Sequence, residues 1–176
     1  MASPRRNAVI SILFVVFGGP GIILLYLPLR MTRFRVPPRE PVWQLLLAGA
    51  LILVGLAPLF ESIVRFIRIG RGTLVPTTRT EHLVVSGLYR YVRNPMYVGV
   101  LTVLIGEVVL FASRDLAIYT AVVWLGMHLF VCFYEEPTLT ARYAERYAVY
   151  KRHVPRWLPR LTPWKGDPEQ ARNLSA

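Results

Sequence analysis

The sequence predicts an all-α, polytopic membrane protein of four or five transmembrane helices followed by a C-terminal amphipathic helix. Three observations support this fold class. The 176 residues are 54% hydrophobic, with a mean hydropathy of +0.42, which lies above the usual range for a soluble domain. Several apolar runs are long enough to cross a hydrocarbon core. Basic residues gather in the segments that separate and follow these runs, as they do in cytoplasmic loops.

The four expected spans are residues 8–29, 42–66, 95–113 and 116–134. The first follows a basic N-terminus without a small-residue cleavage site, so we expect a retained span rather than a signal peptide. The glycine-rich stretch at residues 18–21 should kink it, either as a packing notch for another helix or as a binding site. In the second span Pro58 predicts a bend, and Glu61 is expected to pair with Arg65 one turn later.

The third span begins with Pro95, which is well placed in a first helical turn because it lacks an N–H. The short connection at residues 113–115 predicts that the third and fourth spans form an antiparallel hairpin. From Pro137 the pattern becomes amphipathic and ends at Pro155. Its apolar face is expected to carry Leu139, Tyr143, Tyr147 and Tyr150.

We therefore expect one membrane domain over residues 1–176. Residues 8–66 would form an N-terminal helical hairpin, residues 67–164 would carry the chemistry, and residues 165–176 would be a disordered polar tail. The net charge of +11 comes from 21 Lys and Arg against 10 Asp and Glu. Because the basic residues flank apolar spans, they predict contact with membrane lipids and argue against nucleic-acid binding.

The placement of arginines predicts the orientation. Four spans put the N-terminus, the central loop and the C-terminal tail on one side, and the rich basic content of that side makes it cytoplasmic. Four arginines in the loop at residues 30–41 then fall on the opposite side. A re-entrant first segment or a fifth span would resolve this conflict, and the sequence leaves both open, together with the oligomeric state.

Two polar segments, residues 81–97 and 135–150, flank the last hairpin. The hairpin should bring Arg93, Asn94 and Tyr97 close to Glu135 and Glu136. Such a cavity, open to the cytosol and the bilayer, suits a zwitterionic or cationic cofactor and a lipid-like acceptor. Carboxylates can hold an ammonium group, an arginine can hold a carboxylate, and tyrosines can stack on a base or face a cation.

Metal binding is not expected. The three histidines, His82, His128 and His153, are scattered and lack the spacing of metal ligands. The single cysteine, Cys132, excludes an internal disulfide and is expected to be a small buried residue.

The stretch SGLYRYVRNPMYVG resembles the signature of the isoprenylcysteine carboxyl methyltransferase and phospholipid methyltransferase superfamily. That signature is a Gly-x-Tyr-x-x-x-Arg-His/Asn-Pro-x-Tyr pattern at the start of a transmembrane helix. The second segment is similar too, with a Glu-Glu pair followed by Leu139, Tyr143, Glu145, Tyr147 and Tyr150 and then Val154-Pro155. The resemblance covers residues 83–159.

The resemblance implies an integral membrane methyltransferase that uses S-adenosyl-L-methionine without a Rossmann domain. It implies a bacterial-type inner membrane protein whose active site faces the cytoplasm. The implied catalytic residues are Arg93, Asn94 and Glu135. The implied cofactor-binding residues are Glu81, His82, Leu83, Val84, Gly87, Tyr89, Asn94, Pro95, Met96, Tyr97 and Glu136.

Two positions depart from the prenylcysteine enzymes. Asn94 stands where they have histidine, which excludes a titrating base there. Cys132 stands where they have a substrate-binding arginine, which argues against a prenylcysteine carboxylate as the acceptor. An isoprenoid or lipid carboxylate, thiol or phenol, or a phospholipid amine, remains open. Glu135 or Glu107 could deprotonate an amine. Glu107 could equally pair with His128 across the hairpin.

Two other classes of function remain. A membrane reductase of the sterol type shares a similar C-terminal half but binds NADPH. A non-enzymatic transporter or scaffold would use the same polar clusters to hold its helices together, and the glycine-rich break in the first span is its best support.

Overall fold

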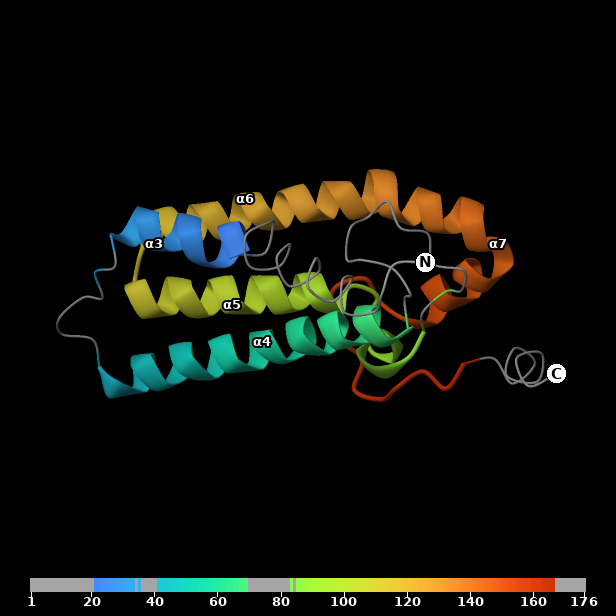
Figure 1. The fold of residues 1–176 in the computed structure, drawn as a ribbon, viewed down its shortest axis with the longest axis horizontal. Helices are drawn as coiled ribbons and strands as arrows, with labels where there is room; N and C mark the ends of the chain where they lie inside the picture. The colour runs from blue at the N-terminus through green and yellow to red at the C-terminus, as the bar shows by residue number, and fades with distance from the viewer. Residues whose placement is uncertain (1–20, 34, 36–40, 70–82, 84, 167–176) are drawn as a thin grey trace. The chain divides into compact units, whose positions relative to one another are not determined.

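A computed structural model describes residues 21–33, 35, 41–69, 83 and 85–166, and only the backbone within 62–69 (Figure 1). Every regular element in these ranges is helical, which confirms the all-α prediction. The glycine-rich break predicted at residues 18–21 lies outside the described residues except for Gly21, and the side chain of Arg65, the expected partner of Glu61, is also outside them.

The chain divides into two compact units. The first contains Met1–Thr80 and Met96–Met127, and the second contains Glu81–Pro95 and His128–Ala176. The predicted single membrane domain stays a prediction. The two units are described separately below.

The helices begin and end close to the expected boundaries. A π-helical turn, η1 (Ile22–Tyr26), leads into α3 (Leu27–Thr32). The helix α4 spans Val42–Ile69, α5 spans Pro95–Phe111 and α6 spans Arg114–Phe130. Two described helical runs, Val42–Glu61 and Arg114–His153, are long and apolar enough to cross a membrane by length and composition. Ile22–Thr32 and α5 are shorter, so the number of four spans remains a prediction.

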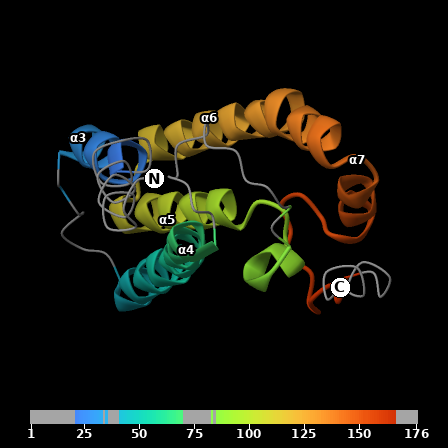
Figure 2. The ribbon, with the colours of Figure 1, turned by 45° about the vertical axis from the view of Figure 1, so that its right-hand side comes forward.

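The turn between α5 and α6 is tighter than the sequence suggested. Ala112 has a left-handed backbone with φ 45°, which ends α5 at Phe111. The Ser113 Oγ then accepts a hydrogen bond of 3.3 Å from the Leu116 N–H and caps α6. The two helices therefore run antiparallel, as Figures 1 and 2 show within the first unit, and this confirms the predicted hairpin.

Glycines allow α4 and α5 to approach closely. A Cβ atom on Gly55 would lie 2.7 Å from the Gly99 carbonyl oxygen, and one on Gly99 would lie 2.6 Å from the Gly55 carbonyl oxygen. Two helical turns further along α5, a Cβ atom on Gly106 would lie 2.8 Å from the Ile52 side chain. Small residues are the usual means by which membrane helices pack backbone to backbone.

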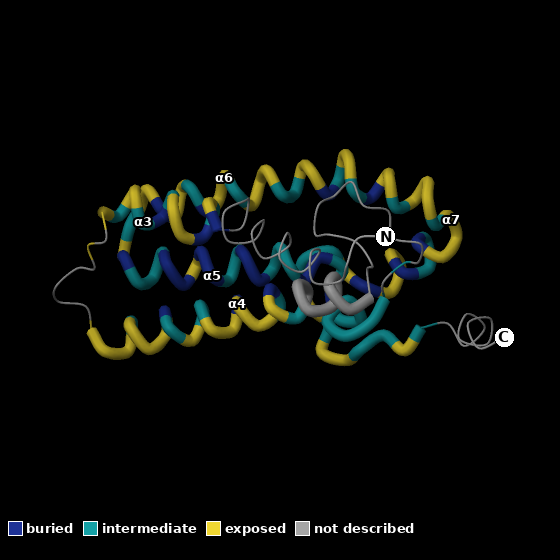
Figure 3. The backbone as a smooth tube through the Cα atoms, in the orientation of Figure 1, coloured by how far each residue is buried: buried dark blue, intermediate teal, exposed yellow. Residues whose placement is uncertain are grey.

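An apolar core lies in the first unit between α4, α5 and η1. Its buried members are Leu24, Leu59, Val100, Val103 and Leu104. Side chains of α6 pack against it, including Tyr119 and Val123. Exposed positions recur along α4 and α6 (Figure 3), and several are large and apolar, such as Leu53, which is 70% exposed. An exposed apolar face of this extent suits contact with lipid.

The second unit contains a short 3₁₀ turn, η2 (Gly87–Arg90), a π-helical turn, η3 (Val131–Glu135), and α7 (Glu136–His153). Pro137 explains the π turn, because proline has no N–H to donate to the carbonyl group four residues earlier. The core of the unit is Tyr147, Tyr150 and Val154, with Leu139, Tyr143 and Trp164 packed against it. This confirms the predicted apolar face of the amphipathic helix.

That helix is not regular, however. Ala144 has φ 44° and ψ −118°, so α7 is kinked in the middle of a segment that periodicity predicts as one helix. Residues on both sides of the kink share one core, since Tyr147 is a member of the cluster and Tyr143 packs against it. The expectation for Cys132 also needs correction, because its side chain is only half-buried.

Candidate functional site

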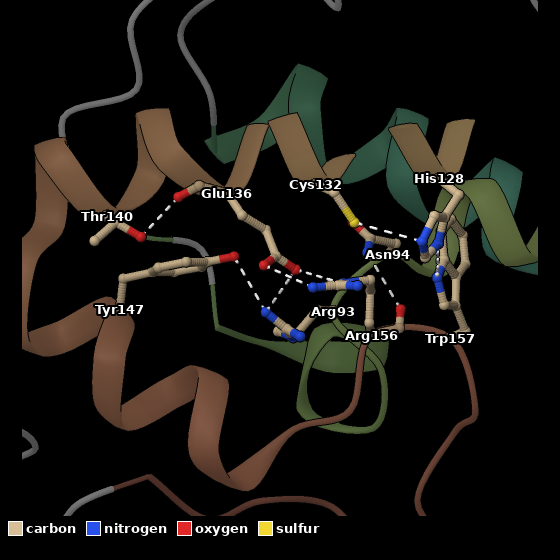
Figure 4. Close-up of polar contacts among 9 residues, drawn as sticks. All are labelled: Arg93, Asn94, His128, Cys132, Glu136, Thr140, Tyr147, Arg156 and Trp157. Atoms are coloured by element: carbon tan, nitrogen blue, oxygen red, sulfur yellow. Dashed lines mark hydrogen bonds and ion pairs between the residues drawn. The ribbon is translucent and has the colours of Figure 1, made fainter. Parts of the chain in front are cut away.

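The two polar segments meet in the second unit. Arg93 Nη1 lies 2.9 Å from Glu136 Oε1, and both side chains are about nine-tenths buried, at 9% and 10% exposure (Figure 4). Arg93 comes from the arginine–asparagine–proline motif, and Glu136 is the second member of the Glu-Glu pair. The structure thus confirms the predicted closeness of these segments.

Glu136 has a second basic partner, Arg156. Its guanidinium donates from Nε to Oε1 at 2.6 Å and from Nη2 to Oε2 at 2.9 Å. This two-bond geometry is the strongest form of an arginine–carboxylate contact. The hydrogen bonds from Arg156 to Glu136 raise the pKa of the guanidinium above its usual range, so Arg156 stays charged.

Backbone bonds hold the first segment against the C-terminal one. The Arg93 N–H donates to the Pro155 carbonyl at 2.9 Å, and the Asn94 Nδ2 donates to the Arg156 carbonyl at 3.2 Å. Arg90 and Trp164 exchange two further bonds, from the Trp164 N–H at 2.9 Å and from Arg90 Nε at 2.6 Å. Asn94 is buried, so its role in the described structure is to fix the Arg156 backbone.

The Gly-x-Tyr part of the motif shapes the approach to this cluster. Gly87 has φ 57°, a left-handed conformation that glycine adopts without strain, and it opens the η2 turn. The Tyr89 carbonyl then accepts a hydrogen bond of 2.7 Å from the Tyr150 hydroxyl. The glycine therefore directs the chain so that this segment lies over the aromatic core of α7.

Two features of this cluster are unusual for an ion pair that serves only to stabilise the fold. Arg93 and Arg156 supply two positive charges to one carboxylate. Arg93 Nη1 also donates to the Tyr147 hydroxyl at 3.3 Å, but the buried Arg93 Nε has no hydrogen-bond partner among the described residues. A buried guanidinium N–H without an acceptor costs free energy, which a ligand bearing an acceptor oxygen would recover.

A second group of side chains surrounds His128. The Trp157 Nε1 donates to His128 Nδ1 at 3.1 Å, and the Cys132 Sγ lies 3.6 Å from His128 Nε2. The indole N–H of Trp157 thus ties the segment after α7 to His128, near the end of α6. No group of three side chains able to hold a metal occurs in the described part of the chain.

The other predicted site residues are placed as follows. Glu81, His82 and Val84 lie outside the described residues. Leu83 packs against the core of the second unit, Pro95 is fully buried at the start of α5, and Glu135 is half-buried beside Glu136. Met96 and Tyr97 belong to the first unit, where Met96 packs against the core, and their role stays a prediction.

Glu107 also belongs to the first unit. It lies twelve residues into α5, or about 18 Å along the helix from Pro95. It is buried, and its Oε2 has no hydrogen-bond partner among the described residues. The predicted alternatives for Glu107, a base or a partner of His128, both remain predictions.

Sequence reasoning missed Arg156 and the Tyr147 hydroxyl. In the sequence, Pro155 and Pro159 flank Arg156 and indicate only the end of a helix. The arginine directly after the Val154-Pro155 element was the available signal. Nothing in its spacing from Glu136 indicated that the two would meet, since the chain turns back between them.

The chain was compared with known proteins and protein families. Residues 43–146 match the model of the family described as phospholipid methyltransferase, which is more than half of the chain. No curated protein and no solved structure was found to match. The matched range includes Arg93, Asn94, Glu135 and Glu136, and it ends before Arg156.

Proposed function

Because this chain belongs to the phospholipid methyltransferase family, we propose that it is an integral membrane methyltransferase that uses S-adenosyl-L-methionine to methylate a lipophilic acceptor. The acceptor would be isoprenoid-like or lipid-like. The observation that supports this proposal best is the Arg93–Glu136 pair, because it joins the two motif segments in one buried cluster within the matched range.

The residues present fit the amino-acid end of that cofactor. This end is zwitterionic, and the cluster holds both a carboxylate and guanidinium groups. The unpartnered Arg93 Nε could donate to the carboxylate group of the ligand, and Glu136 could accept from its ammonium group through the lone pairs that the arginines leave unused. The adenosine end would be held by the segment from Glu81 to Tyr89 and by residues 94–97.

When bound, S-adenosyl-L-methionine supplies an electrophilic methyl group on a positively charged sulfur atom. The contribution of the chain would be to orient the reactants and to exclude water, and alignment alone can account for a large rate gain. Asn94 cannot titrate, so it would orient groups rather than move protons. For an amine acceptor, Glu135 would take up the proton of the ammonium form before methyl transfer.

The apolar exposed faces of α4 and α6 support entry of the acceptor from the bilayer. The basic residues of the central loop and the C-terminal segment support a site on the cytoplasmic side of the membrane. The family resemblance implies a membrane of bacterial inner-membrane type.

Ligand-dependent stability tests the proposal. Detergent-purified protein should unfold at a higher temperature with saturating S-adenosylhomocysteine, because a ligand that binds only the folded state stabilises it. NADPH, the cofactor of the sterol-type reductases, should give no shift. A shift with NADPH alone, or none with either ligand, would count against the proposal. Transfer of a radiolabelled methyl group to fractionated membrane lipids would then identify the acceptor class.

A further inference from the structure

The C-terminal segment after α7 contributes to the candidate cofactor site. Arg156 lies beyond the range that matches the family, yet among the described residues it makes two of the three contacts between arginines and the Glu136 carboxylate. Its side chain is 30% exposed, so it covers Glu136 from the outer side of the cluster, whereas Arg93 is nine-tenths buried.

Arg156 is itself held by its neighbours in the chain. Pro155 accepts a backbone bond from the Arg93 N–H, and the Arg156 carbonyl accepts a bond from the Asn94 side chain. The next residue, Trp157, donates its indole N–H to His128. Three consecutive residues are thus anchored, which places the guanidinium reproducibly.

Arg93 and Arg156 contact the Glu136 carboxylate in different ways. Arg156 engages both oxygens of Glu136, while the contact given for Arg93 runs from its terminal Nη1 to Oε1. Arg93 Nε is left without an acceptor among the described residues. Without Arg156, both oxygens of Glu136 would be open to a side-on two-bond contact with Arg93, through Nε and a terminal nitrogen, which would use that N–H.

We propose that Arg156 is a positioning residue, which fixes the Glu136 carboxylate and so keeps the Arg93 Nε–H available for the carboxylate group of the cofactor. This inference rests on the proposed function. The Arg93 Nε–H, which would bind the cofactor's carboxylate group, would then depend on Arg156, a residue outside the matched range. It also explains why two guanidinium groups share one carboxylate.

Two ligands that differ only at the amino-acid end test this role. S-adenosylhomocysteine carries that end, and 5′-methylthioadenosine retains the base, the ribose and the thioether but lacks it. Their dissociation constants would be measured by calorimetry on full-length protein in detergent, for wild type, Arg156→Gln, Arg156→Lys and the control Arg152→Gln. Arg152 is exposed and lies at the end of α7.

Both Arg156 variants should raise the dissociation constant of S-adenosylhomocysteine by about tenfold or more, the size expected for one lost charge-assisted bond. They should leave the dissociation constant of 5′-methylthioadenosine unchanged. Lysine is included because it keeps the charge but cannot form the two-bond contact. We expect Arg156→Lys to keep the fold, and the melting temperature measured without ligand checks this. Arg152→Gln should change neither dissociation constant.

Three results would overturn the inference. If the substitutions weaken the binding of both ligands equally, Arg156 only supports the fold. Unchanged or tighter binding of S-adenosylhomocysteine would mean that Arg156 does not prepare Arg93, and full recovery in Arg156→Lys would mean that charge alone suffices. Failure of the wild-type protein to bind S-adenosylhomocysteine would instead contradict the proposed function.

Discussion

The Arg93 guanidinium and the Glu136 carboxylate lie 2.9 Å apart in a buried cluster, although they belong to separate motifs on either side of a helical hairpin. Arg156 completes the cluster by binding the same carboxylate. Since both motif residues are nearly inaccessible, the pair links the candidate site to the stability of the second unit.

Glu136→Gln should weaken S-adenosylhomocysteine binding, whereas Glu145→Gln on the exposed side of α7 should not. The variant removes the carboxylate that pairs with the buried Arg93, which should also cost about 3 kcal/mol of stability. Calorimetry and thermal unfolding measure the two effects. Equal effects of the two substitutions on binding would show that the role assigned to Glu136 is misplaced.

Ala144→Gly should stabilise the protein. Ala144 adopts φ 44° and ψ −118°, a region that is strained for alanine and open to glycine. Relief of this strain should raise the free energy of unfolding by about 1 kcal/mol. Ala148→Gly, one turn later in the same helix, is the matched control and should destabilise by about 0.5–1 kcal/mol. If both glycines destabilise to the same extent, α7 is not kinked at Ala144.

Gly99→Val should separate α4 from α5. Even a Cβ atom at this position would lie 2.6 Å from a backbone oxygen of α4, which has no room to move without shifting the helix. We expect a loss of more than about 2 kcal/mol in unfolding free energy, the range of overpacked cores. Gly126→Ala is the control, because nothing lies within 4 Å of its added carbon and alanine favours a helix. A tolerated Gly99→Val would contradict the close contact.

Tyr150→Phe should destabilise the second unit without changing its apolar core. The hydroxyl donates a 2.7 Å bond to the Tyr89 carbonyl, and its loss would leave that acceptor without this donor. Such a loss costs about 1–3 kcal/mol. Tyr134→Phe removes an exposed hydroxyl and should be nearly neutral. The two variants are compared by thermal unfolding in the same detergent, and equal stability would argue against the Tyr150–Tyr89 bond.

The helices were largely predictable because their signals are local. Apolar runs and their flanking charges indicated α4, α5 and α6, and the spacing of Leu139, Tyr143, Tyr147 and Tyr150 indicated the buried face of α7. The closeness of Arg93 to Glu136 followed from the hairpin, since a tight turn must bring the far ends of two antiparallel helices together.

The sequence by itself thus determined the helical class, the two motif segments and their approach to one another. The tertiary structure decided the contact between Gly55 and Gly99, the kink at Ala144 and the position of Arg156 on Glu136. These features depend on how segments pack after they have formed, and helical periodicity carries no record of that packing. Arg156 is the clearest case, because only the return of the chain after α7 brings its guanidinium to the carboxylate at the start of that helix.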